Sequence, residues 1–265
     1  MPDVDSTLVN YKLEDGIAIL QLNRPEKLNA FSDDLVRALM AALRRFDTDP
    51  KAHVAIICGN GRAFSSGADV VQRQLRPREE LERLGGPQGE GARGGDLLTR
   101  CVNWKPVVAA VHGYVMGMAL AVMLDCDLVV AEEGTQMQVT ETSRGIGGAT
   151  HWTLLAHSGA AAFGNEVALT GRFFTAEEAF KANIINRLAP KGQVMPIAME
   201  LARAVAANPP LSVRATVRVR RGQLAQINHE TTMLTVADKL HLTEDFREAA
   251  LANREKRKPR PFQGR

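Results

Sequence analysis

The chain has 265 residues, of which 45% are hydrophobic and 24% charged, and its formal net charge is +3. These values are typical of a globular protein and exclude an intrinsically disordered chain, a collagen and a coiled-coil rod. The longest apolar run, residues 115–124, is too short to cross a bilayer, and residues 1–12 lack the basic and apolar segments of an export signal. Cys58, Cys101 and Cys126 form no CxxC pair, so we expect no disulfide framework, no zinc knuckle and a reducing cytoplasm as the location.

Two short strands, at residues 8–13 and 16–22, come first in the chain, and Asp15-Gly16 between them is typical of a hairpin turn. A helix follows, with Ser32 as a suitable N-cap and an apolar face that ends near Asp49-Pro50. Residues 53–58 then predict a buried strand that runs into a glycine-rich turn at 59–69.

The middle of the chain and its C-terminal part differ in pattern. Residues 72–96 are polar and rich in Arg, Glu and Gly, which predicts part helix and part mobile loop. Buried strands at 105–113 and 126–131 flank a tight turn and an apolar helix, and this alternation predicts an α/β architecture with crossover connections. Mainly helical stretches follow at 212–226, 230–240 and 245–256. We therefore expect a core of residues 1–205 and a helical region of residues 206–265.

Positive charge gathers in the last twelve residues, which hold six basic side chains and one acidic side chain. A protein that binds nucleic acid over a broad surface spreads its positive charge over a face, so this distribution does not favour a nucleic-acid partner. The tail could contact a phosphate-bearing small molecule, an RNA or only solvent.

The turn at 59–69 does not fit the better-known glycine motifs. Phe64 stands where GxGxxG needs its third glycine, and no GK[ST] follows, which excludes a dinucleotide fingerprint and a P-loop. Neither Ser65 nor Ser66 has a glycine two positions earlier, which excludes a nucleophile elbow. What remains is a strand and a tight turn in which Gly67 lets the next amide, that of Ala68, point into a cleft.

A second turn, at residues 113–117, leads in the same way from a strand into an apolar helix that begins near Met118. The N–H groups at such a helix start are unpaired and lie at the positive end of the helix dipole. Two turns that each offer an amide to one point form an oxyanion hole, whereas in most proteins such glycine turns only connect strands with helices.

Five segments, taken together and in this order, resemble the enoyl-CoA hydratase/isomerase (crotonase) superfamily: residues 24–31, 59–70, 105–131, 169–190 and 244–265. The resemblance covers nearly the whole chain and is weakest at 72–100. It implies a spiral of ββα units with a C-terminal helical region used in trimerisation, often as a dimer of trimers. It also implies an acyl-CoA thioester as substrate, with coenzyme A as part of that substrate and no separate cofactor.

The resemblance assigns the two oxyanion-hole amides by position to Ala68 and Met118, where the second position is usually glycine in hydratases. The Met118 side chain would therefore border the cleft and change its shape. The same resemblance implies contacts to the substrate, from this subunit or a neighbouring one, for Lys27, Leu28, Ala30, Asp69, Val70, Val71, Gly117, Lys256, Lys258 and Phe262.

A typical hydratase of this family uses two glutamates, and here Ala121 occupies the first position while Glu141 matches the second. To add water, an enzyme must deprotonate the water and return a proton to the α-carbon, and two groups most readily share these tasks. To move a double bond, one base is enough, because it takes a proton at one carbon and returns it at another. The resemblance and the single glutamate therefore favour isomerisation of an enoyl-CoA, with Glu141 as acid and base.

Several alternatives remain open at this point. They are hydration with one glutamate, decarboxylation or hydrolysis of an acyl-CoA, and a non-catalytic protein that binds coenzyme A or RNA, since one fold serves several functions. Without the resemblance, Glu141 is an exposed carboxylate in a turn.

The remaining polar residues carry weaker expectations. His112 is expected to be a packed side chain, Asp125 and Asp127 are expected to cap or pair, and His151 and His157 flank the turn after Glu141 and could reach the pocket. His229-Glu230 is not part of an HExxH motif, so we expect no metal site, and we expect neither a membrane nor a nucleic acid as partner.

Overall fold

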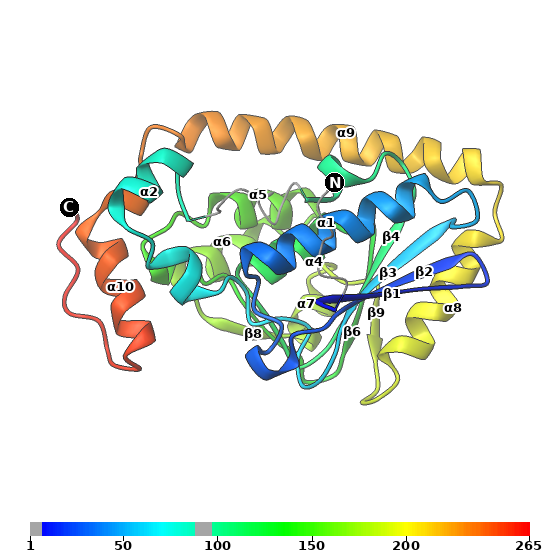
Figure 1. Ribbon diagram of the computed structural model, residues 1–265, viewed down its shortest axis with the longest axis horizontal. Coiled ribbons are helices and arrows are strands. Elements are labelled where there is room, and N and C mark those ends of the chain that lie inside the picture. Colours follow the sequence, from blue (N-terminus) through cyan, green and yellow to red (C-terminus); the bar gives the residue numbers. More distant parts are fainter. Residues whose placement is uncertain (1–6, 88–96) are drawn as a thin grey trace.

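The main sheet of the protein has six strands in the order β1-β2-β3-β4-β6-β9 (Figure 1). The computed structural model describes residues 7–87 and 97–265. β1 and β2 form the predicted antiparallel hairpin, and every later strand joins the sheet in parallel, which confirms the α/β architecture. The strands are β1 (Val9–Glu14), β2 (Ile17–Leu22), β3 (Val54–Gly59), β4 (Val107–Val111), β6 (Leu128–Glu132) and β9 (Arg187–Ala189).

A second sheet has three short strands, β5 (Tyr114–Met116), β7 (Gln136–Gln138) and β8 (Phe173–Thr175). β5 follows β4 and β7 follows β6, so the chain adds one strand to each sheet in turn before it enters a helix. Ser65 extends this second sheet, because it makes a parallel bridge to Val115. This repetition is the expected spiral of ββα units.

Helices cover both faces of the main sheet because its strands alternate apolar side chains toward two separate cores. On β3, Ala55 and Ile57 belong to the larger core, which includes the buried face of α1 (Asp33–Thr48), whereas Ile56 and Cys58 belong to the smaller core under α8 (Val194–Ala206). α1 starts as predicted, since the Ser32 hydroxyl accepts a hydrogen bond from the Leu35 amide.

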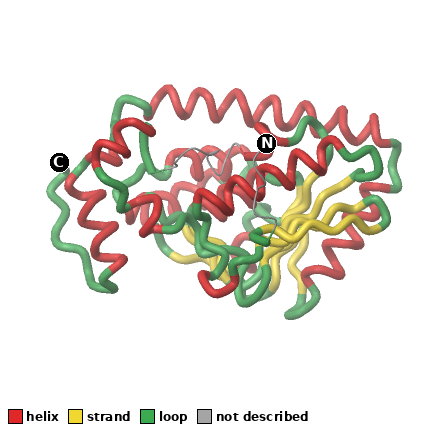
Figure 2. The backbone as a smooth tube through the Cα atoms, viewed as in Figure 1, coloured by secondary structure: helices red, strands yellow, loops and turns green. Residues whose placement is uncertain are grey.

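Shorter helical elements connect the strands and the longer helices (Figure 2). Within 72–96, the expected helix is α2, while residues 88–96 of the expected loop lie outside the described part. The shorter helical elements are η1 (Pro25–Lys27), η2 (Val70–Gln74), α2 (Arg78–Leu84), α3 (Leu97–Cys101), α4 (Met118–Asp125), η4 (Thr142–Arg144), α5 (Ala149–His157), α6 (Ala161–Thr170), α7 (Ala176–Lys181) and η5 (Leu240–Leu242).

The C-terminal region is one long helix and one short helix, α9 (Pro210–Thr235) and α10 (Glu244–Arg254). The prediction of two separate helices at 212–226 and 230–240 was wrong. The helix continues through this stretch because Ile227 packs against the larger core and the Thr231 hydroxyl lies 2.7 Å from that of Thr153 on α5. α9 runs along one side of the molecule and brings its C-terminal end close to α2 and α10 (Figure 1).

Two arginines of α9 attach this helix to the end of α4. Arg220 donates to the carbonyls of Leu124, Asp125 and Cys126, which are acceptors at the C-terminal end of α4. Both Arg220 and Arg221 also pair with Asp127, at 3.1 and 2.6 Å. Asp127 therefore pairs as the sequence predicts, and the middle of α9 is held at a defined place on the core.

None of the helices within 7–87 and 97–265 is both long and apolar enough to cross a membrane. Cys58, Cys101 and Cys126 are buried and form no disulfide with one another. Burial raises the pKa of the Cys58 thiol to about 12 and that of the Cys126 thiol well above its usual value, so these two thiols are protonated and unreactive at neutral pH.

Candidate active site

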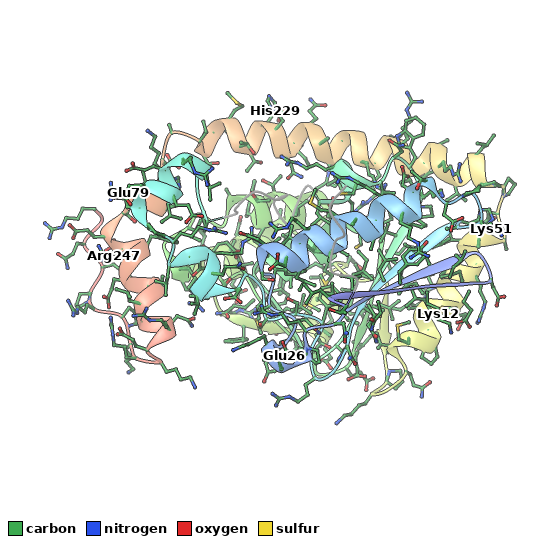
Figure 3. The ribbon with its side chains drawn as sticks, in the orientation of Figure 1. Lys12, Glu26, Lys51, Glu79, His229 and Arg247 are labelled. Atoms are coloured by element: carbon green, nitrogen blue, oxygen red, sulfur yellow. The ribbon has the colours of Figure 1, made fainter. Side chains whose placement is uncertain are left out.

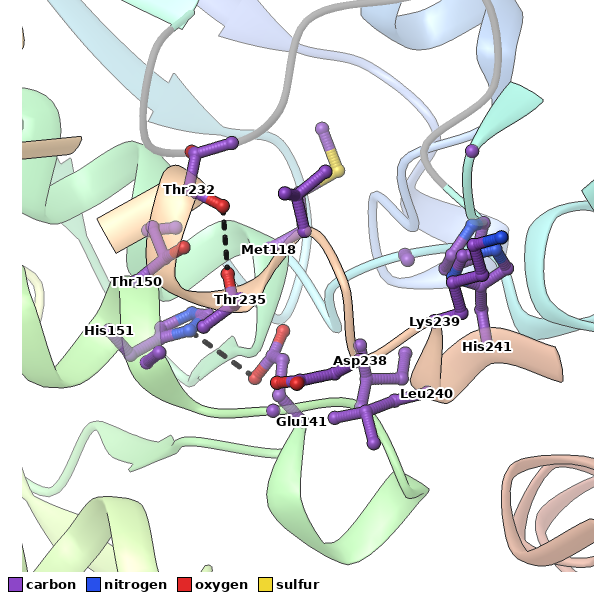
Figure 4. A pocket seen from close by; sticks show the side chains of 18 of the residues that line it. Met118, Glu141, Thr150, His151, Thr232, Thr235, Asp238, Lys239, Leu240 and His241 are labelled. Carbon is purple, nitrogen blue, oxygen red and sulfur yellow. Dashed lines mark hydrogen bonds and ion pairs between the residues drawn. The ribbon is translucent and has the colours of Figure 1, made fainter. Parts of the chain in front are cut away.

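A cavity of about 270 Å³ lies between the core and the C-terminal end of α9. Its walls come from four parts of the chain: the two glycine turns with α4, the turn at Glu141 with α5, the segment from η2 to the end of α2, and the end of α9 with the connection that follows it. Figure 4 shows the side chains that line it. The lining residues are Ala68, Arg73, Gln74, Gly85, Pro87, Met118, Ala121, Glu141, Ile146, Gly147, Ala149, Thr150, His151, Thr232, Thr235, Val236, Asp238, Lys239, Leu240 and His241.

The two glycine turns run side by side at the bottom of this cavity. The Ser65 amide donates to the Tyr114 carbonyl at 3.0 Å, and the Met116 amide donates to the Ser65 carbonyl at 3.2 Å. This pairing brings Ala68 and Met118, one residue from each turn, into the wall of the same cavity. Among the described residues, the amides of Ala68 and Met118 donate to no backbone carbonyl outside the regular elements, so both are free to face a substrate oxygen.

Glycine is required at two positions for this close approach. Gly67 has φ +89°, and a Cβ there would lie 2.5 Å from the Met116 carbonyl oxygen. Gly117 has φ +48°, and a Cβ there would overlap Thr140 Oγ1 and lie 2.9 Å from Glu141 Oε1. The carboxylate of Glu141 therefore lies directly beside the residue that precedes Met118.

Glu141 is held at the start of η4, and its side chain is only 19% exposed. Its carbonyl accepts hydrogen bonds from the amides of Arg144 and Ile146, which fixes the turn, and the Thr140 hydroxyl lies 3.4 Å from its Oε2. Burial lowers the pKa of the Arg144 guanidinium, and the nearby charge of Glu141 acts in the opposite direction. Glu141 is therefore a carboxylate of the cavity and not an exposed side chain of a turn.

The position of the missing carboxylate is occupied by Ala121, which is buried and lines the cavity. A neighbouring polar group is His151 on α5, which is 4% exposed and has its Nδ1 3.6 Å from Glu141 Oε2. The expectation that His151 could reach the pocket is confirmed. His157, at the other end of α5, is exposed and does not line the cavity within the described residues.

The segment predicted to hold coenzyme A lies next to the first glycine turn. The Ser66 amide donates to the Leu28 carbonyl at 2.9 Å, so Lys27, Leu28 and Ala30 border the turn that carries Ala68. Asp69 pairs with Arg24 at 2.8 Å. Burial alone would raise the pKa of the Asp69 carboxyl, but hydrogen bonds from Arg24 and from backbone amides together hold it below its usual value. Val70 and Val71 begin η2, and Val71 is 64% exposed.

The basic tail lies against α10 and away from the cavity wall. Asp245 accepts from the amides of Gln263 and Gly264, and Glu248 accepts from the amide of Arg260. Lys256, Lys258 and Phe262 are exposed side chains along this path and are not among the described residues that line the cavity. Their contact with coenzyme A stays a prediction.

One wall of the cavity was not anticipated from the sequence. It consists of Thr232 and Thr235 on α9 and of residues 236–241 after it, which the sequence pattern assigned to a helix. Lys239 has φ +45°, so the chain turns sharply at this point and comes back toward the core. No local pattern marks this reversal, because its residues have ordinary helix propensity.

Among the described residues, His112, Asp125 and His229 are not part of the cavity lining. His112 is half-buried, with its Nε2 2.9 Å from the Gly61 carbonyl. Asp125 is fully buried and accepts a hydrogen bond from the Leu98 amide. His229 is exposed and points outward from α9 (Figure 3). The described residues contain no group of three or more His, Cys, Asp or Glu side chains that could hold a metal ion.

Comparison with known proteins agrees with this geometry. The family model described as Enoyl-CoA hydratase/isomerase matches residues 12–265. The chain is 33% identical to a mevalonyl-coenzyme A hydratase of Aspergillus fumigatus over 97% of its length and 95% of that protein, and 32% identical to a putative enoyl-CoA hydratase of Thermus thermophilus over 89% and 87%.

A solved structure, EchA1_1 from Mycobacterium paratuberculosis, superposes with a TM-score of 0.82 at 27% identity and covers 98% of this chain and 100% of that one. The glycine turns, the cavity between them and α9, and these matches along nearly the whole chain lead to one conclusion. The chain belongs to the enoyl-CoA hydratase/isomerase family of acyl-CoA enzymes.

Proposed function

We propose that the protein moves the double bond of an enoyl-CoA through a thioester enolate. Glu141 takes the proton from the α-carbon, the electron pair of the broken C–H bond moves toward the thioester oxygen, and Glu141 returns the proton to the γ-carbon. The amides of Ala68 and Met118 donate to the negative oxygen while the enolate exists. Coenzyme A is part of the substrate, and the proposal needs no separate cofactor.

One observation carries this proposal: the carboxylate of Glu141 lies beside the Gly117 backbone that leads into Met118, while Ala121 supplies no second carboxylate at the neighbouring position. A single base that faces an oxyanion donor is sufficient for proton transfer between two carbons. Addition of water needs a further group that holds and orients the water.

Hydration is a second candidate because His151 lies 3.6 Å from Glu141 and could orient a water molecule in place of a second glutamate. The names of the two relatives, a mevalonyl-coenzyme A hydratase and a putative enoyl-CoA hydratase, also favour it. Both reactions pass through a thioester enolate that the two amides would stabilise. In hydration, water adds to the β-carbon and the α-carbon gains a proton, whereas isomerisation moves a proton from the α-carbon to the γ-carbon.

The assay that separates them uses 3-enoyl-CoA and 2-enoyl-CoA thioesters of one short and one long chain. We expect the protein to interconvert the two isomers faster than it hydrates the 2-enoyl form, as measured by absorbance of the conjugated thioester and by mass spectrometry of the products. Faster hydration than isomerisation by the wild-type protein overturns the isomerase proposal and favours hydration. Glu141→Gln should lower kcat by about 100-fold or more for either reaction, which is the usual contribution of a general base.

The assembly and the location of the enzyme are part of the same proposal. We propose a trimer or a dimer of trimers in which Lys256, Lys258 and Phe262 contact coenzyme A. Sedimentation with and without an acyl-CoA tests the assembly. We propose a reducing cytoplasm as the location, which the absence of a disulfide among the three buried cysteines of the described residues supports.

A further inference from the structure

His151 contacts two different parts of the candidate site with its two ring nitrogens. Its Nε2 lies 2.9 Å from the carbonyl oxygen of Gly117, and its Nδ1 lies 3.6 Å from Glu141 Oε2. The ring is 4% exposed, on the first turn of α5, and it faces Glu141 across the cavity wall (Figure 4). Neither contact is a feature that the family's two-glutamate pattern requires.

The contact with Gly117 bears on the oxyanion hole. The carbonyl of Gly117 and the amide of Met118 belong to one peptide group, in which the C=O and the N–H point in opposite directions. Two donors reach this carbonyl, the Ala121 amide at 3.1 Å and His151 Nε2 at 2.9 Å. The hydrogen bond from His151 therefore adds to the helical one in holding the plane in which the Met118 N–H lies, and it further polarises that N–H as a donor. Of the ring and the carbonyl, only the ring can donate, so Nε2 carries a proton.

In the neutral ring, a proton on Nε2 leaves a lone pair on Nδ1. A neutral imidazole with its proton on Nε2 has an acceptor at Nδ1, and the Glu141 carboxylate is also an acceptor. Among the described residues, no hydrogen bond satisfies His151 Nδ1, although the atom is buried. The 3.6 Å between Nδ1 and Oε2 is longer than a hydrogen bond. The two atoms become complementary when one proton arrives on either of them.

We propose that His151 is a positioning residue that orients the Met118 amide through Gly117 and exchanges one proton with Glu141. This inference rests on the proposed proton transfer. When Glu141 has taken the α-proton, its O–H bond breaks, an Nδ1–H bond forms, and the products are the Glu141 carboxylate and the His151 imidazolium. The reverse transfer restores the acid before it protonates the γ-carbon. Atoms and charge balance without any other reactant.

Other charged or titratable side chains lie near Glu141 or line the same cavity. Arg144 on η4 interacts with Glu141, and the cavity lining includes Arg73 on η2 and Asp238, Lys239 and His241 after α9. His241 is the other histidine of the cavity, and burial, together with the charge of Lys239, lowers its pKa. A dependence of kcat on pH is therefore assigned to His151 only if His241→Gln retains it and a variant of His151 lacks it.

Two variants separate the two contacts. His151→Gln keeps an amide NH₂ at about the reach of Nε2, so it can still donate to Gly117, but it has no group that accepts and releases a proton. His151→Leu removes both. His157→Gln, an exposed histidine on the same helix, is the matched control.

We expect His151→Leu to lose about 100-fold in kcat with little change in KM, comparable to the loss of an oxyanion-hole donor. His151→Gln should recover most of this loss at its best pH but lack the histidine step in the pH dependence of kcat. A kcat of His151→Leu within about threefold of wild type overturns the orientation role. A pH profile of His151→Gln that equals the wild-type profile overturns the proton exchange.

A second measurement does not depend on turnover. In ¹⁵N-labelled protein, the His151 ring signals, assigned by their loss in His151→Gln, should show the Nε2–H tautomer, and an Nδ1–H tautomer overturns the inference. Exchange of the α-protons of a saturated acyl-CoA in D₂O tests the proposed function separately. If the wild-type protein catalyses no exchange, the proposed function fails, whereas exchange that is equal in wild type, His151→Leu and His157→Gln overturns only the inference about His151.

Discussion

Replacement of Gly117 by alanine tests the placement of Glu141 directly. A Cβ at this residue would overlap Thr140 Oγ1 and lie 2.9 Å from Glu141 Oε1, whereas ordinary contacts of a Cβ begin at 3.4 Å. The carboxylate must therefore move by about half an ångström or more, and a misplacement of about 1 Å can cost about 100-fold in rate. We expect kcat of Gly117→Ala to fall by about 10- to 100-fold.

The same substitution also strains the backbone, because Gly117 has φ +48° and ψ −115°. Such a conformation costs a residue with a side chain about 1–3 kcal/mol. At about 2–4 °C per kcal/mol, the midpoint of thermal unfolding should fall by roughly 2–12 °C. Stability and activity must therefore be measured on the same samples, at a temperature where Gly117→Ala is fully folded.

The matched control is Gly134→Ala. Gly134 also has a positive φ, +77°, but a Cβ there would meet nothing within 4 Å, and the residue lies outside the cavity lining. This variant should lose about 1 kcal/mol of stability through backbone strain and keep its kcat. The assay is the rate of enoyl-CoA turnover at saturating substrate together with thermal unfolding by circular dichroism. If Gly117→Ala loses no more activity than Gly134→Ala, the position of the Glu141 carboxylate does not depend on its close contact with Gly117.

Three further predictions concern other parts of the chain. Ala121→Glu should raise the rate of hydration of a 2-enoyl-CoA relative to isomerisation. The increase should be modest, because a buried carboxylate facing Glu141 carries desolvation and like-charge costs. An unchanged product ratio in mass spectrometry contradicts this prediction. The double variant Lys256→Gln, Lys258→Gln should bind an acyl-CoA more weakly in titration calorimetry, and the loss should be greater at low salt, because the charges act on phosphates through solvent. Equal weakening at both salt levels, or no weakening, contradicts the prediction. Lys12→Gln is the control. Burial raises the pKa of Asp125 to about 7, above its value in the unfolded chain, so the free energy of unfolding should fall as the pH rises from about 4 through 7. Asp125→Asn should remove this fall. If denaturant titrations give the variant the same dependence of unfolding free energy on pH as wild type, the prediction is refuted.

Much of the fold follows from local pattern. The hairpin at Asp15-Gly16, the cap at Ser32 and the buried strands are set by residues within a few positions of each other, and the structure has them where the pattern predicts. The length of α9 is different. The helix continues past residue 226 because Ile227 packs against the larger core and Thr231 contacts Thr153 on α5. These contacts join residues that are far apart in the sequence.

The candidate site divides in the same way. Ala68, Met118 and Glu141 lie on turns with recognisable sequences, and all three line one cavity. The contact between His151 and the Gly117 carbonyl depends on how α5 packs against α4, which no spacing in the chain encodes. The wall after α9 depends on the path that the chain takes from residue 236 onward, to which the positive φ of Lys239 contributes.

The attachment of α9 by Arg220 and Arg221 has a consequence for how this enzyme could diversify. The groups that would carry out the chemistry lie on the spiral core. The opposite wall of the cavity follows the C-terminal end of α9, which Arg220, Arg221 and Thr231 hold against the core. Insertions or substitutions in residues 236–241 can therefore reshape the space for the acyl chain without moving Glu141 or the glycine turns. Selection for a new substrate can act on a segment that the reaction itself does not constrain.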